Sequence, residues 1–216
     1  MGSRWRGTIT ASMLLSHALG AAELDVAVST TKGPVAEAVV AIVAHGGAPI
    51  ARDPAPATKI IDQKNEAFIP FVEIFRLGDS VVFRNSDQTR HHVYSFAPAR
   101  QFEFVLTPGQ SSAPLRLEHA GAIAVGCNIH DHMITYLYVA DAPWVERTGS
   151  DGKARVPVLP PGDYDVSVWH PLLRPGRDAP QQALHVGATD EHVQLTFTLA
   201  LLPDPRRGAD RERVDY

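Results

Sequence analysis

The sequence contains one cysteine, Cys127, among its 216 residues. A lone cysteine forms no disulfide within the chain, so cysteine pairing gives no information about the redox compartment. The haem-attachment pattern CxxCH is missing as well. Beyond the first twenty or so residues, no apolar run approaches the ~20 residues that a membrane-spanning helix needs. These absences leave a chain without cross-links and without a predicted membrane span.

Neither sign of charge dominates the composition. There are 20 Lys and Arg against 24 Asp and Glu, which gives a net charge of −4. Nucleic-acid-binding domains carry clustered basic residues, and no such cluster is found here, so we expect no nucleic-acid partner. A hydrophobic content of 44% and a charged content of 20% are typical of a soluble globular protein. The length suits one large domain or two small ones.

The first 22 residues have the composition of a secretory signal peptide. Arg4 and Arg6 precede an apolar stretch, Ile9 to Leu19, which is followed by the small residues 20–22. This order of basic, apolar and small residues predicts cleavage near Ala22 and a periplasmic or secreted protein. Removing the two arginines changes the net charge of the mature chain from −4 to about −6.

The remaining sequence predicts an all-β fold. Seventeen prolines and sixteen glycines are spread along the chain, and turn signals recur about every ten residues, as in a β-sandwich or barrel. Short alternating or apolar stretches predict strands between these turns. The clearest are Leu24–Val28, Val35–Val43, Glu73–Leu77, Ser80–Phe83, Phe102–Leu106, Thr135–Val139, Tyr164–Trp169 and His192–Leu199.

The stretch from Cys127 to Met133 carries the most specific chemistry. It offers a thiolate, the imidazole of His130 and a thioether within seven residues, a soft ligand set that suits copper. Cys127 could instead be a small buried hydrophobic residue, which is the commonest state of a free cysteine. Zinc also binds Cys and His, but methionine is a poor ligand for it. A catalytic Cys-His pair is a further alternative, although no orienting group is recognisable.

A second histidine ligand must come from elsewhere, and His91-His92 is the source we expect. Adjacent residues of a strand face opposite ways, so only one of the two can readily reach the metal. Residues 85–87 form a polar turn just before them and could also hydrogen-bond around the site.

These residues resemble the cupredoxin family of type 1 blue-copper proteins. The pattern Cys127-x-x-His130-x-x-Met133, with His91 upstream, is of the amicyanin and plastocyanin type, and its short loop looks most like that of amicyanin. The match spans about residues 58–141. The resemblance implies a Greek-key cupredoxin sandwich and one type 1 copper held by His91, Cys127, His130 and Met133. His92 stands where the family usually has Asn, which leaves His91 and His92 as alternatives for the upstream ligand. His92, Asn85 and Asn128 are the expected hydrogen-bonding residues around the ligands.

The function implied by the resemblance is transfer of single electrons, without enzymatic activity. A cytochrome or a dehydrogenase would dock transiently, and Ile129, Ile134 and Pro98 are candidates for the apolar docking patch. Two alternatives remain open. One is a copper-binding or delivery module without a redox partner. The other is an adhesion or interaction sandwich in which copper is structural.

The flanking sequence resembles a second, smaller sandwich of the carboxypeptidase-regulatory or transthyretin-like type. Gly33-Pro34 with the apolar residues 38–40 matches the first part of its pattern, and residues 151–164 match the second. We therefore expect the cupredoxin domain, 58–141, to be inserted in or packed on a sandwich formed by 23–57 and 142–202. The charged residues 203–216 are expected to form a disordered tail.

Overall fold

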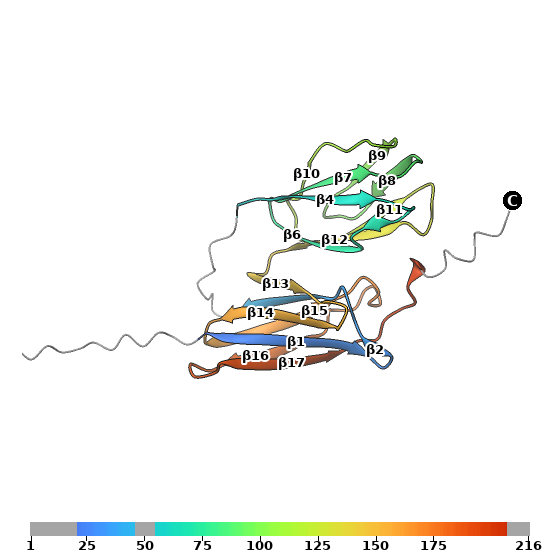
Figure 1. The fold of residues 1–216 in the computed structure, drawn as a ribbon. Helices are drawn as coiled ribbons and strands as arrows, with labels where there is room; N and C mark the ends of the chain where they lie inside the picture. The colour runs from blue at the N-terminus through green and yellow to red at the C-terminus, as the bar shows by residue number, and fades with distance from the viewer. Residues whose placement is uncertain (1–20, 46–54, 207–216) are drawn as a thin grey trace, which may run out of the picture.

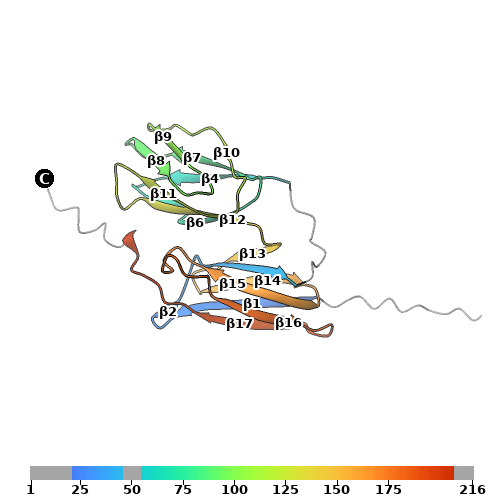
Figure 2. The same ribbon diagram turned by 180° about the vertical axis from the view of Figure 1, so that it is seen from behind.

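The computed structural model describes residues 21–45 and 55–206. The regular elements in these residues are all β-strands, which confirms the all-β fold class. The strands form four sheets that stack in pairs as two sandwiches (Figures 1 and 2). No helix in the described part of the chain is long and apolar enough to cross a membrane.

Parts of three predicted segments lie outside the described residues. These are residues 1–20 of the signal peptide, 46–54 of the segment 23–57, and 207–216 of the tail. Ala22, the last residue of the predicted signal peptide, is the fully buried first residue of β1 (Ala22–Thr30). Arg206, in the predicted tail, lies over the ring of Phe71, 3.3 Å from its centroid.

The sandwich formed by the middle of the chain, called here the central sandwich, contains two sheets. One sheet has the strand order β10-β7-β4-β5 and the other β6-β12-β11-β8-β9. The strands are β4 (Thr58–Gln63), β5 (Phe68–Ile69), β6 (Val72–Arg76), β7 (Ser80–Asn85), β8 (His91–Ser95), β9 (Phe102–Leu106), β10 (Leu115–Arg116), β11 (Gly121–Cys127) and β12 (Ile134–Ala140).

The chain crosses repeatedly between these two sheets, as in a Greek-key sandwich. It passes from β6 in the five-stranded sheet to β7 in the four-stranded sheet and returns to the first for β8 and β9. It then crosses to the four-stranded sheet for β10 and back to the five-stranded sheet for β11. Two of the resulting pairs are parallel, β4 with β7 and β6 with β12. The sheets enclose one apolar core, in which Phe75, Phe83 and Leu137 are fully buried.

The first and last parts of the chain form the second pair of sheets, called here the flanking sandwich. The sheets are β14-β1-β17, with β2 paired to β1, and β13-β3-β15-β16. These strands are β2 (Gly33–Pro34), β3 (Val39–Ala44), β13 (Trp144–Arg147), β14 (Lys153–Leu159), β15 (Gly162–Trp169), β16 (Gln181–Val186) and β17 (His192–Thr198). Both sheets contribute to a separate core that includes Leu24, Ile42 and Tyr164. That this sandwich belongs to the carboxypeptidase-regulatory type stays a prediction.

An apolar seam joins the two sandwiches. Phe71 and Val72 of the central sandwich share a buried cluster with Val39 and Val145 of the flanking one. Trp169, at the end of β15, packs its ring against Tyr138 at a centroid distance of 5.1 Å. The Trp169 ring also contacts the ring of Tyr136, on the same strand as Tyr138, at a centroid distance of 6.0 Å.

The two ends of the central sandwich are held near each other at one turn. Asp79 accepts hydrogen bonds from the backbone N–H of Ala57 at 2.7 Å and of Arg76 at 2.8 Å. The Arg76 guanidinium in turn donates to the carbonyl oxygens of Ala142 and Pro143. The chain therefore enters and leaves the central sandwich at the same place, as an insertion requires. That residues 58–141 fold independently stays a prediction.

Candidate metal centre

Three side chains predicted to bind metal come together at one end of the central sandwich. The Nδ1 atom of His91 lies 3.7 Å from Sγ of Cys127, and Nδ1 of His130 lies 3.9 Å from the same sulfur. One donor atom from each residue lies within 4.8 Å of the other two. His91 is fully buried, Cys127 is 3% exposed, and the His130 side chain is 19% exposed. Only His130 therefore approaches the surface.

Sheet register explains how residues 36 positions apart meet. Strands β8 and β11 pair antiparallel, with Cys127 opposite Val93 and Gly126 opposite Tyr94. His91, Val93 and Ser95 are the buried residues of β8, and they alternate with His92 and Tyr94. His91 therefore faces the interior beside the end of β11, and His92 faces outward. Of the two alternatives for the upstream ligand, His91 is the residue placed beside Cys127.

The loop between β11 and β12 is closed by its own backbone. Cys127 N–H donates to the Met133 carbonyl at 3.2 Å, and Met133 N–H donates to the His130 carbonyl at 3.0 Å. These bonds fold the loop back over Cys127, so that His130 returns to the sulfur. Met133 is 1% exposed and belongs to the same buried cluster as Cys127. Its role as an axial ligand stays a prediction.

The donor set fits a small soft cation. Metal bonds of about 2.0 Å to imidazole and 2.3 Å to thiolate, at tetrahedral to trigonal angles, separate nitrogen from sulfur by about 3.5 to 3.7 Å. The observed separations of 3.7 and 3.9 Å are close to these values. Both histidines turn the same kind of nitrogen, Nδ1, toward the sulfur. The arrangement leaves a buried nucleophilic thiol little access to a substrate, so it favours metal binding over a catalytic Cys-His pair.

His92 and Asn128 form a hydrogen-bonded pair on the outer side of the sheet. The His92 carbonyl accepts the N–H of Asn128 at 3.0 Å, and Asn128 Nδ2 lies 3.4 Å from His92 Nδ1. The other ring nitrogen of His92 lies 2.8 Å from a carboxylate oxygen of Glu103. The pair connects the ligand loop to β8. The predicted influence of these two residues on a bound metal stays a prediction.

Asn85 orders the loop that leads to His91. It is fully buried, and its side-chain nitrogen donates to the carbonyl oxygens of Thr89 and Leu106 at 2.8 and 2.9 Å. Its side-chain oxygen accepts the N–H of Asp87 at 2.9 Å. Asn85 therefore acts on His91 through the loop and does not contact the ring.

Two carboxylates lie behind the histidine rings. Asp87 Oδ2 lies 2.8 Å from Nε2 of His91, and Glu66 Oε1 lies 3.9 Å from Nε2 of His130. Burial raises the pKa of Asp87, but hydrogen bonds from Glu66 N–H, His91 and Asn65 N–H outweigh it and leave that pKa below its ordinary value. The sequence placed Asp87 only in a polar turn, and nothing in the sequence singled out Glu66.

A second group of possible metal donors lies on the flanking sandwich. Glu23, Asp25 and His192 bring one donor atom each within 4.8 Å of the others. The guanidinium of Arg155 already lies 2.9 Å from Asp25 and 3.4 Å from Glu23. The hydrogen bond from Arg155, with one from His192, lowers the pKa of Asp25. The group therefore forms a surface ion-pair network in which the guanidinium of Arg155 is the cation.

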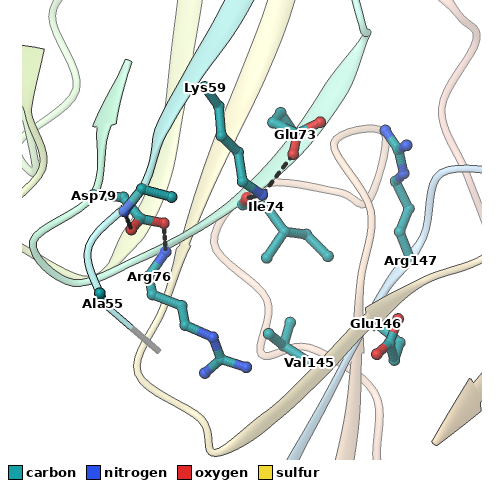
Figure 3. A pocket seen from close by; sticks show the side chains of 10 residues that line it. Ala55, Lys59, Glu73, Ile74, Arg76, Asp79, Val145, Glu146 and Arg147 are labelled. Atoms are coloured by element: carbon teal, nitrogen blue, oxygen red, sulfur yellow. Dashed lines mark hydrogen bonds and ion pairs between the residues drawn. The ribbon is translucent and has the colours of Figure 1, made fainter. Parts of the chain in front are cut away.

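A cavity of about 470 Å³ opens where the two sandwiches meet (Figure 3). Lys59 on its wall pairs with Glu73 at 2.8 Å, and Asp79 is occupied by two backbone N–H groups. Burial raises the pKa of Glu146, and the positive charge of Arg76 only partly opposes this effect. Lys59, Glu73 and Asp79 are thus already paired with other groups of the protein. None of the His-Cys-His residues lines the cavity.

The apolar residues predicted for a docking patch have different surroundings. Ile129, next to His130, is 45% exposed, and Pro98 is also exposed. Ile134 instead is partly buried and packs against the seam between the sandwiches, in surroundings unlike those of Ile129, and the docking patch itself stays a prediction. Ile134 follows Met133 in sequence, but it faces the flanking sandwich because β12 forms part of the seam.

Comparisons with known proteins find likenesses at the level of structure. No family model and no curated protein sequence matches the chain. Amicyanin from Paracoccus versutus (Thiobacillus versutus) is 19% identical over 46% of this chain and 97% of its own, at a TM-score of 0.35. A purple cupredoxin from Nitrosopumilus maritimus is 20% identical over 39% of this chain and 99% of its own, at 0.34.

A copper-containing nitrite reductase from Thermus scotoductus SA-01 is also found. It is 24% identical over 46% of this chain and 25% of its own, at a TM-score of 0.34. At these scores the likenesses do not assign the chain to a family. The features that the structure establishes are an all-β architecture and a His-Cys-His group at one end of a sandwich, with His91 and Cys127 buried and His130 partly exposed.

Proposed function

We propose that this protein is a periplasmic or secreted blue-copper protein that carries single electrons through one type 1 copper. The observation that supports the proposal most is the convergence of His91 Nδ1, Cys127 Sγ and His130 Nδ1 beside a buried methionine. One thiolate, two imidazoles and one thioether form a ligand set that favours copper over zinc. Bound copper would supply one-electron chemistry by alternating between its cupric and cuprous states.

The chain's own contribution would be a rigid and dry frame. His91 comes from one strand and Cys127 from its neighbour, while two backbone hydrogen bonds close the loop that carries His130. A frame of this kind holds the donor atoms in place in either charge state, which keeps structural reorganisation small. The apolar surroundings of Cys127 exclude water, and such a shell influences the reduction potential.

The same burial favours an electron carrier over a copper-delivery module. Passing an ion to another protein requires donor atoms that the acceptor can approach. Cys127 is 3% exposed and His91 is fully buried, whereas the partly exposed His130 offers a short route for electrons. A cytochrome or a dehydrogenase is the proposed partner, docking transiently near Ile129 and Pro98.

We assign no enzymatic activity to the chain, and we propose that the flanking sandwich is of the carboxypeptidase-regulatory type.

A copper titration of the purified protein tests the proposal. Adding Cu(II) should produce an intense visible charge-transfer absorption that saturates at one copper per chain. The electron paramagnetic resonance spectrum should show the small copper hyperfine splitting of a thiolate-bound type 1 site. Weak absorption typical of nitrogen and oxygen ligands, or preferential binding of Zn(II) in competition, would contradict the proposal.

A further inference from the structure

The two histidines of the site have their outer nitrogens next to carboxylates. Nε2 of His91 lies 2.8 Å from Oδ2 of Asp87, which is hydrogen-bonding distance. Nε2 of His130 lies 3.9 Å from Oε1 of Glu66, which is within ion-pair range but long for a hydrogen bond. The inner nitrogens, Nδ1 in both rings, face Cys127.

The contact with Asp87 determines which nitrogen of His91 carries the proton. An ionised carboxylate only accepts hydrogen bonds, so Nε2 must be the donor. Neutral imidazole then has its lone pair on Nδ1, the atom 3.7 Å from the sulfur of Cys127. His91 is fully buried and its ring cannot exchange this partner for water.

Asp87 also holds the turn that carries Glu66. Its Oδ1 accepts the N–H of Asn65, and its Oδ2 accepts the N–H of Glu66 at 3.0 Å. The turn joins β4 to β5, and the parallel pairing of β4 with β7 places Gln63 opposite Asn85. One carboxylate therefore connects a ligand histidine to the turn beside the other histidine.

The turn is strained, which indicates that it needs this support. Asn65 and Glu66 both have φ of +55°, in the left-handed region. Asn tolerates that region, but a tight hairpin turn prefers Gly at the second position, and Glu is disfavoured there because its Cβ crowds the backbone. Strained residues of this kind persist where surrounding contacts hold them and are concentrated at functional sites.

We infer that Asp87 is a positioning residue for the metal site. It fixes the Nδ1 lone pair of His91 toward Cys127 and, through the Asn65-Glu66 turn, sets Glu66 behind His130. The inference deepens the proposed function and rests on it for the identity of the metal. A carboxylate behind an imidazole ligand makes the ring a stronger donor and stabilises the more highly charged ion, so Asp87 should favour Cu(II) over Cu(I).

The first test uses the metal-free protein, so it does not depend on copper binding. Long-range ¹H–¹⁵N NMR correlations of the imidazoles report which nitrogen is protonated. Wild-type His91 should be in the Nε2–H form, and Asp87→Asn should weaken that preference. Asp62→Asn is the matched control, because Asp62 contacts Arg84 and Ser86 but no ligand histidine. A wild-type His91 in the Nδ1–H form would overturn the inference, even if the variant does not fold.

The second test measures copper affinity and reduction potential. Loss of a carboxylate behind a ligand histidine typically weakens metal binding 10- to 100-fold. If Asp87→Asn weakens the binding of Cu(II) and not that of Cu(I), the reduction potential should rise by about 60 mV for each tenfold loss of Cu(II) affinity. Glu66→Gln should shift it in the same direction by less, and Asp62→Asn should leave it unchanged. Unchanged copper affinity together with an unchanged potential in Asp87→Asn would reject the positioning role. A wild-type protein without the blue spectrum would instead reject the proposed function, while the NMR result on Asp87 would stand.

Discussion

Cys127 is the residue on which copper binding can be tested most directly. We expect Cys127→Ser to abolish the visible charge-transfer band, because the hydroxyl that replaces the thiol is a poor ligand for copper. The change is nearly isosteric, and Cys127 makes no side-chain contact that requires sulfur apart from those with the two histidines. Far-ultraviolet circular dichroism should therefore keep its β-sheet form. A band that persists in the variant would show that the thiolate is not the ligand.

Alanine variants of His91 and His92 test which of these adjacent histidines is the upstream copper ligand. His91→Ala should remove the type 1 spectrum, because His91 supplies a fully buried nitrogen 3.7 Å from the sulfur. His92→Ala should retain it with a small shift, because His92 faces outward to Glu103. Copper-loaded absorption spectra of both variants make the measurement. The opposite result would place the upstream ligand one residue later.

At the scale of the strand and its connections, Thr148 joins β13 to the beginning of β3. Its side-chain oxygen accepts the N–H of Ala38 at 2.9 Å and donates to the carbonyl of Val35 at 2.7 Å, and the residue is buried. Thr148→Val keeps the shape but leaves both backbone groups without this partner, which costs about 1 to 3 kcal/mol. Urea unfolding measures the loss. Thr107→Val, at an exposed position, should change stability by less than about 0.5 kcal/mol.

His170, which follows β15, gives the flanking sandwich a pH dependence. Burial lowers the pKa of this histidine from 6.5 to about 4. The unfolded chain takes up the proton at its ordinary pKa, so the stabilising effect is complete above about pH 6.5 and is lost as pH falls toward 4. Each pH unit in that window removes at most about 1.4 kcal/mol. Urea unfolding of the metal-free protein at several pH values should show this slope, and it should be smaller in His170→Gln.

The sequence predicted strands best where the apolar pattern was strong. Phe102–Leu106 was predicted with the bounds of β9, and Tyr164, Val166 and Val168 are buried on one face of β15 as expected. Strand β13 was not predicted, because it is four residues long and only one of its side chains is buried. Strand β16 was missed because its first residues are polar and its buried residues are only Leu184 and Val186.

The site was predictable to the extent that it is local in sequence. Cys127, His130 and Met133 lie within seven residues of one another, so their spacing drew attention to them, and the family resemblance then implied them as ligands. The alternation of a strand predicted opposite faces for His91 and His92, but the choice between them needed the register of β8 against β11. The position of Glu66 near the site could not be predicted from the sequence, because it depends on the pairing of β4 with β7 and on the hydrogen bond to Asp87.

At the scale of the whole molecule, the central sandwich has what a separable domain needs. Its core is distinct from that of the flanking sandwich, and its two ends meet at Arg76 and Asp79. The main cost of separation is the seam, where Phe71, Tyr136 and Tyr138 would become exposed to water.

We therefore expect residues 56–143 to fold alone, with lower stability than in the full chain, and to bind one copper with the same visible spectrum. A piece of this size is marginal, and copper should raise its melting temperature because it binds only the folded form. Thermal unfolding with and without Cu(II) makes the measurement. The matched control is the same piece with Cys127→Ser, which should fold but gain little from copper. A piece that stays unfolded even with copper would show that the seam is part of one common fold. A piece that folds without the blue spectrum would count against the four proposed ligands.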